Sequence, residues 1–263
     1  MLARCALVLS VAVALVAAGC GSADDFTVPA LGDPRGNPQL PDLVPAPPVD
    51  VHTRLDDETG RWTLRFSSTL ANVGDGPFIL HARRTGAGWT VEQEVAFSEE
   101  GGASHGVGVD MAWGGDGHDH WHIRDVAHYQ LLAADDAAQI DEDSLVDGKI
   151  GFCFFDSGRA VEGLGDDDPT YHHESCGAED DREIGMGLSV GWHDEYTFAL
   201  PGQSIDIHGV PDGVYRLVAV ADPDAAFDES DETNNETFVD LELSTTEAGQ
   251  RVARVIEVGP SPE

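Results

Sequence analysis

Hydrophobic and polar residues alternate in short runs from residue 41 onward. The runs are 49–55, 61–74, 77–84, 89–97, 128–134, 149–155, 204–210, 214–222 and 236–243. Turn-forming stretches separate the early runs, and no stretch keeps a 3.6-residue period. The pattern predicts one all-β domain over 41–245, an antiparallel β-sandwich with a C-terminal extension at 246–263. Long irregular loops are expected at 99–117 and 157–186, and loops of that length often carry function.

The first forty residues have a different composition. Residues 1–19 combine an early arginine with an apolar run and small residues, which predicts a signal peptide and an exported protein. The segment resembles a bacterial lipoprotein signal, which would leave Cys20 to be lipidated and anchor the protein to the outer face of the cell membrane by that lipid alone. The alternative is an ordinary secretory signal and a secreted protein. Residues 20–40 are rich in Gly, Pro and Asp and predict a flexible tether.

Acidic residues outnumber basic residues by 49 to 14, and the formal net charge is −35. This charge excludes nucleic acid as a partner, because a phosphate backbone requires a positive surface. The acidity either keeps the surface soluble in high salt or attracts cationic substrates through a long-range field. The acidic residues are spread along the chain, which favours the first explanation.

Two cysteines remain once the signal peptide is removed and Cys20 is lipidated. Cys153 and Cys176 lie in an exported chain, which predicts one disulfide. Metal ligation is the alternative, but their spacing matches no zinc motif.

The sequence GHDHWHIRDVAHYQLL contains the densest chemical signal. His118, His120 and His122 alternate with other residues, so on a strand they share one face. Three imidazoles suit copper or zinc, although all three reach one ion only if the strand bends or bulges. A surface histidine cluster is the alternative. His128 has the same parity and is expected to support the site rather than to be a fourth ligand.

This stretch resembles the copper-binding signature of the lysyl oxidases. The segments GKIGFCFFD, GLSVGWHDEY, SIDI, PDGVYRLVAVADP and ESDETNN follow in that family's order, and the resemblance covers about residues 41–242. It implies copper at His118, His120 and His122. It also implies a lysine tyrosylquinone built from Lys149, four residues before Cys153, and from Tyr196.

Lys149 is the only lysine of the chain. In the chemistry that the resemblance implies, copper and dioxygen oxidise a phenol to an ortho-quinone, and a primary amine adds to the ring. Arginine cannot replace lysine, because its guanidinium stays protonated. The implied activity is oxidation of a primary amine, or of lysine side chains in extracellular proteins, by dioxygen. Asp125 and His128 are candidates for the catalytic base, and His193 is a weaker one.

A structural calcium site is also implied by the resemblance. The family binds calcium between the segment that corresponds to ESDETNN and a Pro-Asp-Leu near the domain start, and oxygen ligands suit that ion. The ligands carried over are Asp42, the Leu43 carbonyl, Glu229, Asp231, Asn234 and Asn235. The alternative is a solvated acidic turn.

The chain departs from the animal enzymes, which carry several disulfides, and from the family pattern in VGVDMAWGGDG before the histidines. These departures affect the loops and the substrate groove more than the cofactor. A competing hypothesis is a calcium-stabilised cell-surface adhesion module whose histidines hold a non-catalytic metal. A zinc hydrolase is a third. Neither accounts for Lys149 and Tyr196 together with the histidines.

Overall fold

A computed structural model describes residues 35–99, 101–115, 118–134 and 146–262. The described residues contain no α-helix, and antiparallel strands make up nearly all of their regular structure. The all-β prediction is therefore confirmed. Within the same ranges, no helix is long and apolar enough to cross a membrane. Cys20 and most of the predicted tether lie outside the described residues.

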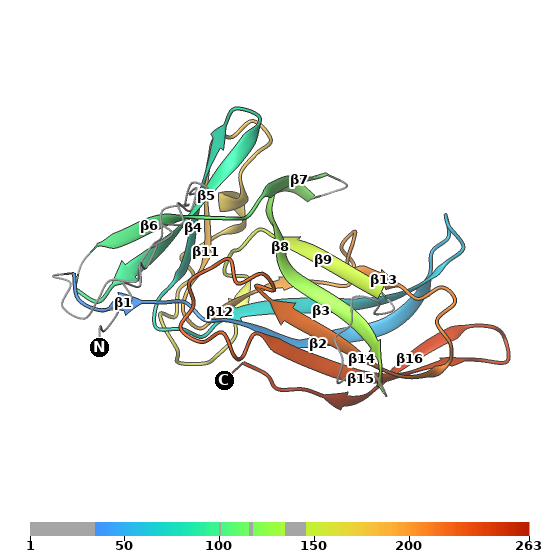
Figure 1. The fold of residues 1–263 in the computed structure, drawn as a ribbon. Helices are drawn as coiled ribbons and strands as arrows, with labels where there is room; N and C mark the ends of the chain where they lie inside the picture. Colours follow the sequence, from blue (N-terminus) through green and yellow to red (C-terminus); the bar gives the residue numbers. More distant parts are fainter. Residues whose placement is uncertain (1–34, 100, 116–117, 135–145, 263) are drawn as a thin grey trace, which may run out of the picture.

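The strands form three sheets (Figure 1). The first contains β1 (Pro38–Gln39), β4 (Phe78–Thr85), β5 (Gly88–Phe97), β6 (Gly102–Val107) and β11 (Glu183–Leu188). The second contains β2 (Leu43–Leu55), β3 (Trp62–Asn72), β10 (Gly158–Arg159), β12 (Trp192–Tyr196) and β13 (Ser204–Asp206). The third contains β7 (Met111–Gly115), β8 (His118–Ala133), β9 (Val146–Phe152), β14 (Gly213–Ala221), β15 (Glu236–Thr245) and β16 (Arg251–Val258).

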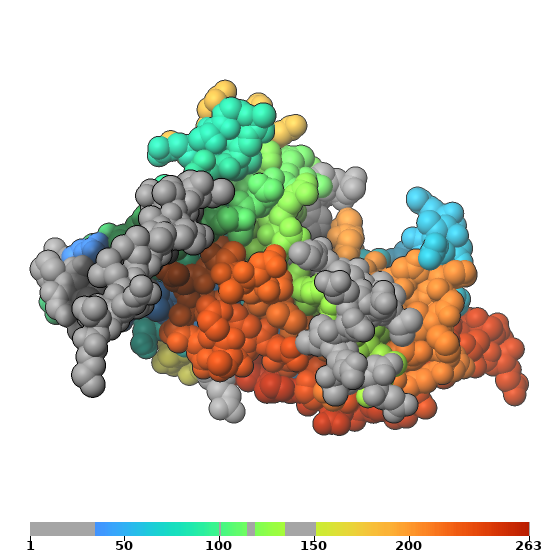
Figure 2. Space-filling view, viewed as in Figure 1, coloured from blue at the N-terminus to red at the C-terminus, as the bar shows by residue number. Residues whose placement is uncertain are grey.

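Aromatic side chains join the sheets. Phe66 on β3 lies against Tyr129 on β8, with ring centroids 5.1 Å apart, so the second and third sheets share one core. Phe78 on β4 packs edge-on against Phe154 and Phe227, each at 4.9 Å, and attaches the first sheet to that core. The turn between β4 and β5 projects from the body at the top of Figures 1 and 2. Strands β8, β9 and β12, which carry the candidate histidines, Lys149 and Tyr196, belong to the second and third sheets.

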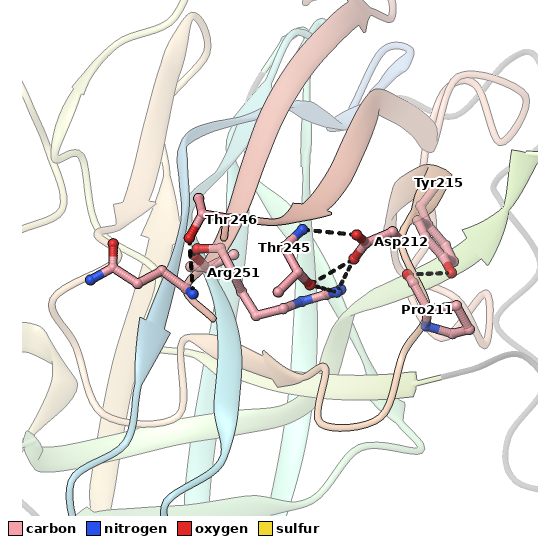
Figure 3. A network of polar contacts seen from close by, with 8 residues as sticks. Pro211, Asp212, Tyr215, Thr245, Thr246 and Arg251 are labelled. Carbon is pink, nitrogen blue, oxygen red and sulfur yellow. Dashed lines mark hydrogen bonds and ion pairs between the residues drawn. The ribbon is translucent and has the colours of Figure 1, made fainter. Parts of the chain in front are cut away.

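A polar network joins the turn before β14 to strands β15 and β16 of the third sheet (Figure 3). Asp212 accepts hydrogen bonds from the backbone and hydroxyl of Thr245, at 2.9 and 2.8 Å, and from Arg251 at 2.5 Å. The Tyr215 hydroxyl donates to the carbonyl of Pro211 at 3.0 Å. These bonds fix the turn before β14 against the β15–β16 hairpin, so β16 continues the sheet over residues expected as a C-terminal extension.

Other segments are more regular than their composition indicated. The loop expected at 99–117 contains β6 and β7, and the loop expected at 157–186 contains β10, the 3₁₀ turn η2 (His173–Cys176) and the start of β11. β2 begins at Leu43, although prolines interrupt it. These prolines are accommodated because β2 pairs with β3 alone and its register shifts between Ala46 and Val49.

Candidate functional site

Strand β8 carries the histidines at its start. Trp121 and Ile123 are buried, while His120 and His122 are half-buried on the opposite face. The ring centroids of His120 and His122 are 4.6 Å apart. The pairing with β7 shifts register opposite the residues between His118 and Trp121. The strand thus has the irregularity that three converging histidines require, although the His118 side chain lies outside the described residues.

A further histidine reaches this cluster from another part of the chain. His173 begins η2, and its ring centroid is 4.8 Å from that of His120, with the ring planes 89° apart. Sequence reasoning missed it, because residues 157–186 had no strand pattern. The signal that could have found it is a histidine three residues before the cysteine predicted to form the disulfide.

Tyr196 lies beside the histidines, at the end of β12. Its side chain is 6% exposed, and its ring centroid is 6.0 Å from that of His122 and 4.3 Å from that of Phe152. The backbone N–H of Cys153 donates to the Tyr196 hydroxyl at 3.0 Å. Burial raises the pKa of this phenol well above its ordinary value, and the nearby Asp194 carboxyl adds to the shift.

Lys149 lies on β9, the strand that ends against Tyr196. Its backbone pairs directly opposite His128 on β8, and it precedes Phe152 by three residues. At a strand rise of about 3.3 Å per residue, its backbone is about 10 Å along β9 from Phe152. Its side chain lies outside the described residues, so the Lys149–Tyr196 cross-link stays a prediction.

The disulfide between Cys153 and Cys176 is present, with the two Cα atoms 5.6 Å apart. Both half-cystines are fully buried. The bond joins η2 to the residue that follows β9, and the same residue donates to the Tyr196 hydroxyl. The predicted disulfide is therefore confirmed, and it lies inside the candidate site.

Asp194 is a buried carboxyl that sequence reasoning did not single out. It lies two residues before Tyr196 on the same face of β12 and is fully buried. Neither of its carboxyl oxygens has a side-chain hydrogen-bond partner within the described part of the chain. Burial, reinforced by the charge of Asp156, raises its pKa well above the ordinary value. A buried carboxyl group with a raised pKa thus lies beside the candidate cofactor residue.

The three candidates for the base differ in position. Asp125 is exposed and has a positive φ of 59°, in the irregular part of β8 where the pairing with β9 shifts register. His128 is half-buried opposite Lys149. His193 lies on the other face of β12 from Tyr196, and burial lowers its pKa. The position of His193 on the opposite face of β12 from Tyr196 therefore disfavours it as the base.

The residues expected at a calcium site come together between the start of β2 and the segment before β15. The Asn234 amide donates to both carboxylate oxygens of Asp42, at 3.0 and 3.1 Å. Glu229 accepts from the Leu43 N–H and, at 3.1 Å, from the Asn235 amide. Desolvation raises the pKa of Glu229 to about 8. The predicted residues Asp42, Glu229, Asn234 and Asn235 therefore form one cluster with the Leu43 backbone.

Two acidic residues that the sequence did not indicate extend the cluster. One oxygen each of Asp222, Glu229 and Glu232 lies within 4.8 Å of the others. The amide oxygens of Asn234 and Asn235 are buried and have no hydrogen-bond partner among the described residues. Asp231, which was predicted as a ligand, is turned toward Thr233, whose N–H and hydroxyl it binds at 2.8 and 2.6 Å.

Clustered imidazoles against a buried tyrosine, on an antiparallel β-sandwich, are an arrangement that can hold a metal for oxidative chemistry. The donor set fits copper, because imidazole nitrogens are among its preferred ligands. The family model described as lysyl oxidase matches residues 109–252, more than half of the chain. The chain belongs to the lysyl oxidase family. This is a family of copper- and quinone-dependent amine oxidases that are generally extracellular. The comparison with curated proteins gives no match.

Proposed function

We propose that this protein is an exported copper-dependent amine oxidase that converts primary amines, including lysine side chains of extracellular proteins, to aldehydes. The overall reaction consumes the amine, dioxygen and water and releases the aldehyde, ammonia and hydrogen peroxide. The observation that carries the proposal is the contact of Tyr196 with the histidine cluster, at 6.0 Å from His122. A tyrosine that only filled the core would have no reason to meet the histidines of this family's copper signature.

Each residue has a defined part in this proposal. Copper would be held by His118, His120 and His122, and it would supply the oxidation of Tyr196 by dioxygen. Burial of Tyr196 keeps bulk water from its ring, and the Cys153 N–H fixes its hydroxyl. Lys149 would provide the amine that bonds to the oxidised ring, which explains why the chain keeps a lysine there. Asp125 and His128 are the proposed groups for removing a proton from the substrate.

Mass spectrometry tests the proposal directly. In copper- and air-treated protein, reduction followed by trypsin should give one species that joins peptide 125–159, uncut at Lys149, to peptide 183–216. Before reduction, the copper-treated protein should react with a hydrazine and absorb as a quinone. The variants Lys149→Arg and Tyr196→Phe should still bind copper but should not form the cross-linked species. Tyr215→Phe is the matched control, because Tyr215 lies in the same peptide but hydrogen-bonds Pro211 instead.

Separate linear peptides from the copper-treated parent would contradict the oxidase proposal. Such a result would favour the adhesion module with a non-catalytic metal, which also contains the acidic cluster. Retained cross-linking in Tyr196→Phe would place the quinone on another residue and would contradict the assignment of Tyr196.

We also propose that the acidic cluster binds calcium and joins the start of β2 to the segment before β15. The buried amide oxygens of Asn234 and Asn235 and the neighbouring carboxylates support this proposal. Calcium at 100 times its dissociation constant would add about 2.7 kcal/mol to the stability. Calcium should therefore raise the melting temperature of the parent but not that of Asp42→Asn, and Asp57→Asn is an exposed control. An unchanged melting temperature of the parent in millimolar calcium would exclude the site.

Attachment to the outer face of the membrane by lipid at Cys20 is a further part of the proposed function. The amine supply would then be extracellular, which is consistent with the general location of this family. Replacing Cys20 with serine should release the protein from the membrane fraction without changing its amine oxidase activity. Retention of the variant in that fraction would contradict the anchor.

A further inference from the structure

His173 approaches the histidine cluster from outside the copper signature. His120 and His122 are neighbours because they alternate on one strand. His173 lies 51 positions after His122 in the sequence, and its ring still lies edge-on to His120 with centroids 4.8 Å apart. The three rings follow one another in the order His122, His120, His173.

The spacing of these rings agrees with imidazoles that share one metal ion. A metal–nitrogen bond of 2.0–2.1 Å places each ring centroid about 3.2 Å from the metal. Two ligands separated by a bond angle of about 90–109° then have centroids about 4.5–5.2 Å apart. The separations of 4.6 and 4.8 Å for the two pairs that include His120 both fall within this range.

The turn that carries His173 is anchored on two sides. Cys176, three residues later, forms the disulfide with Cys153 at the end of β9. Beyond it, the Ala178 carbonyl accepts a hydrogen bond from the indole N–H of Trp121 at 3.0 Å, and Trp121 is the residue between His120 and His122. The turn is thus attached to β8 and to the residue that follows β9. A histidine held in this way can bind a metal with little loss of conformational freedom.

We propose that His173 is a copper ligand in addition to the histidines of β8, so that the metal site spans β8 and the disulfide-anchored turn. This inference rests on the proposed copper site, which it extends by one residue. The exposure of His173 places this ligand at the solvent side of the site. The disulfide between Cys153 and Cys176 then has a role beyond stability, because it positions a metal ligand.

The test compares copper binding in four proteins: the parent, His173→Ala, His172→Ala and His120→Ala. The dissociation constant for Cu²⁺ is measured by competition with a chelator. The number of coordinated imidazoles is counted by pulsed electron paramagnetic resonance. His172 is the matched control, because it is the adjacent exposed histidine and no ring contact joins it to the cluster in the described structure. Circular dichroism checks the fold of each variant.

We expect His173→Ala to weaken copper binding at least tenfold and to lose one imidazole from the spectrum, while His172→Ala stays within twofold of the parent. If His173→Ala keeps the parent's dissociation constant and imidazole count while His120→Ala loses both, the inference about His173 is wrong and the copper site stands. If His120→Ala also behaves like the parent, the copper site itself is wrong, and His173 is excluded with it.

Discussion

Removing the disulfide is the perturbation whose effect can be worked out most fully. Replacing Cys153 and Cys176 with alanine opens a loop of 23-residue separation. The chain-entropy relation for a loop of this length gives a stabilisation of about 3 kcal/mol, which the variant would lose. Alanine is preferred to serine, because both sulfur positions are fully buried and a hydroxyl there would have to find a partner.

Removing this disulfide should also weaken copper binding. Removing a disulfide remote from the site would not have that effect. The bond attaches the His173 turn to the end of β9, and Cys153 also donates its N–H to Tyr196. Without the bond, η2 loses its covalent link to the residue after β9. It is then held by the Trp121–Ala178 hydrogen bond, by packing against Phe155 and by the bonds of the preceding Thr170 and Tyr171 to Asp156. We therefore expect the double alanine variant to bind copper about as weakly as His173→Ala.

The assay is urea unfolding of the copper-free parent and variant, with copper titrations of both. Chemical reduction of the parent should reproduce the stability loss of the variant. Adding His173→Ala to the double alanine variant should weaken copper binding little further, because both changes remove the same ligand. A stability loss below about 1 kcal/mol would refute the loop-closure argument. Full additivity of the two copper effects would refute the role of the bond in positioning His173.

Two further predictions concern the strands around the site. A Cβ on Gly151 would lie 2.7 Å from the carbonyl oxygen of Ile123 and 3.2 Å from the Cβ of His122, so Gly151→Ala should lower stability by about 1–3 kcal/mol and weaken copper binding. Gly106→Ala meets nothing within 4 Å and is the control; equal effects in urea unfolding would contradict the steric reason. Burial raises the pKa of Asp194 in the folded state above its unfolded-state value of about 3.9. The contribution of Asp194 to the free energy of unfolding is therefore fully present below that pH and is lost as the pH rises. Asp194→Asn should therefore gain stability relative to the copper-free parent as the pH rises above about 4, and a constant difference in urea unfolding would contradict this.

The elements that follow a local rule could be predicted from the sequence. Alternation located the central strands, and the cysteine count located the disulfide. The spacing of the histidines anticipated an irregular β8. Each of these features depends on neighbouring residues or on composition, so a single sequence is enough to predict it.

The residues that were missed depend on contacts between distant segments. His173 has no periodic context, and only the folded disulfide shows that its turn faces His120. The local sequence HDEY indicates an exposed position for Asp194. Its burial instead depends on the pairing of β12 with β3, which is distant in the sequence. The start of β2 was hidden by its prolines, and pairing with β3 overcame their low strand propensity. The types of residue at the site could therefore be predicted more easily than the distant segments that come together there.

The end of β9 explains how the fold can orient the candidate cofactor tyrosine. Pairing with β8 includes Phe152 and does not continue to Cys153, whose N–H is therefore available for a side-chain acceptor. The Tyr196 hydroxyl takes that position, and Phe152 packs against its ring. A phenylalanine there would leave a buried N–H without an acceptor, at a cost of about 1–3 kcal/mol. The ladder thus ends where the phenol must be held beside His122, so the same strand end serves both the stability of the sandwich and the geometry of the site.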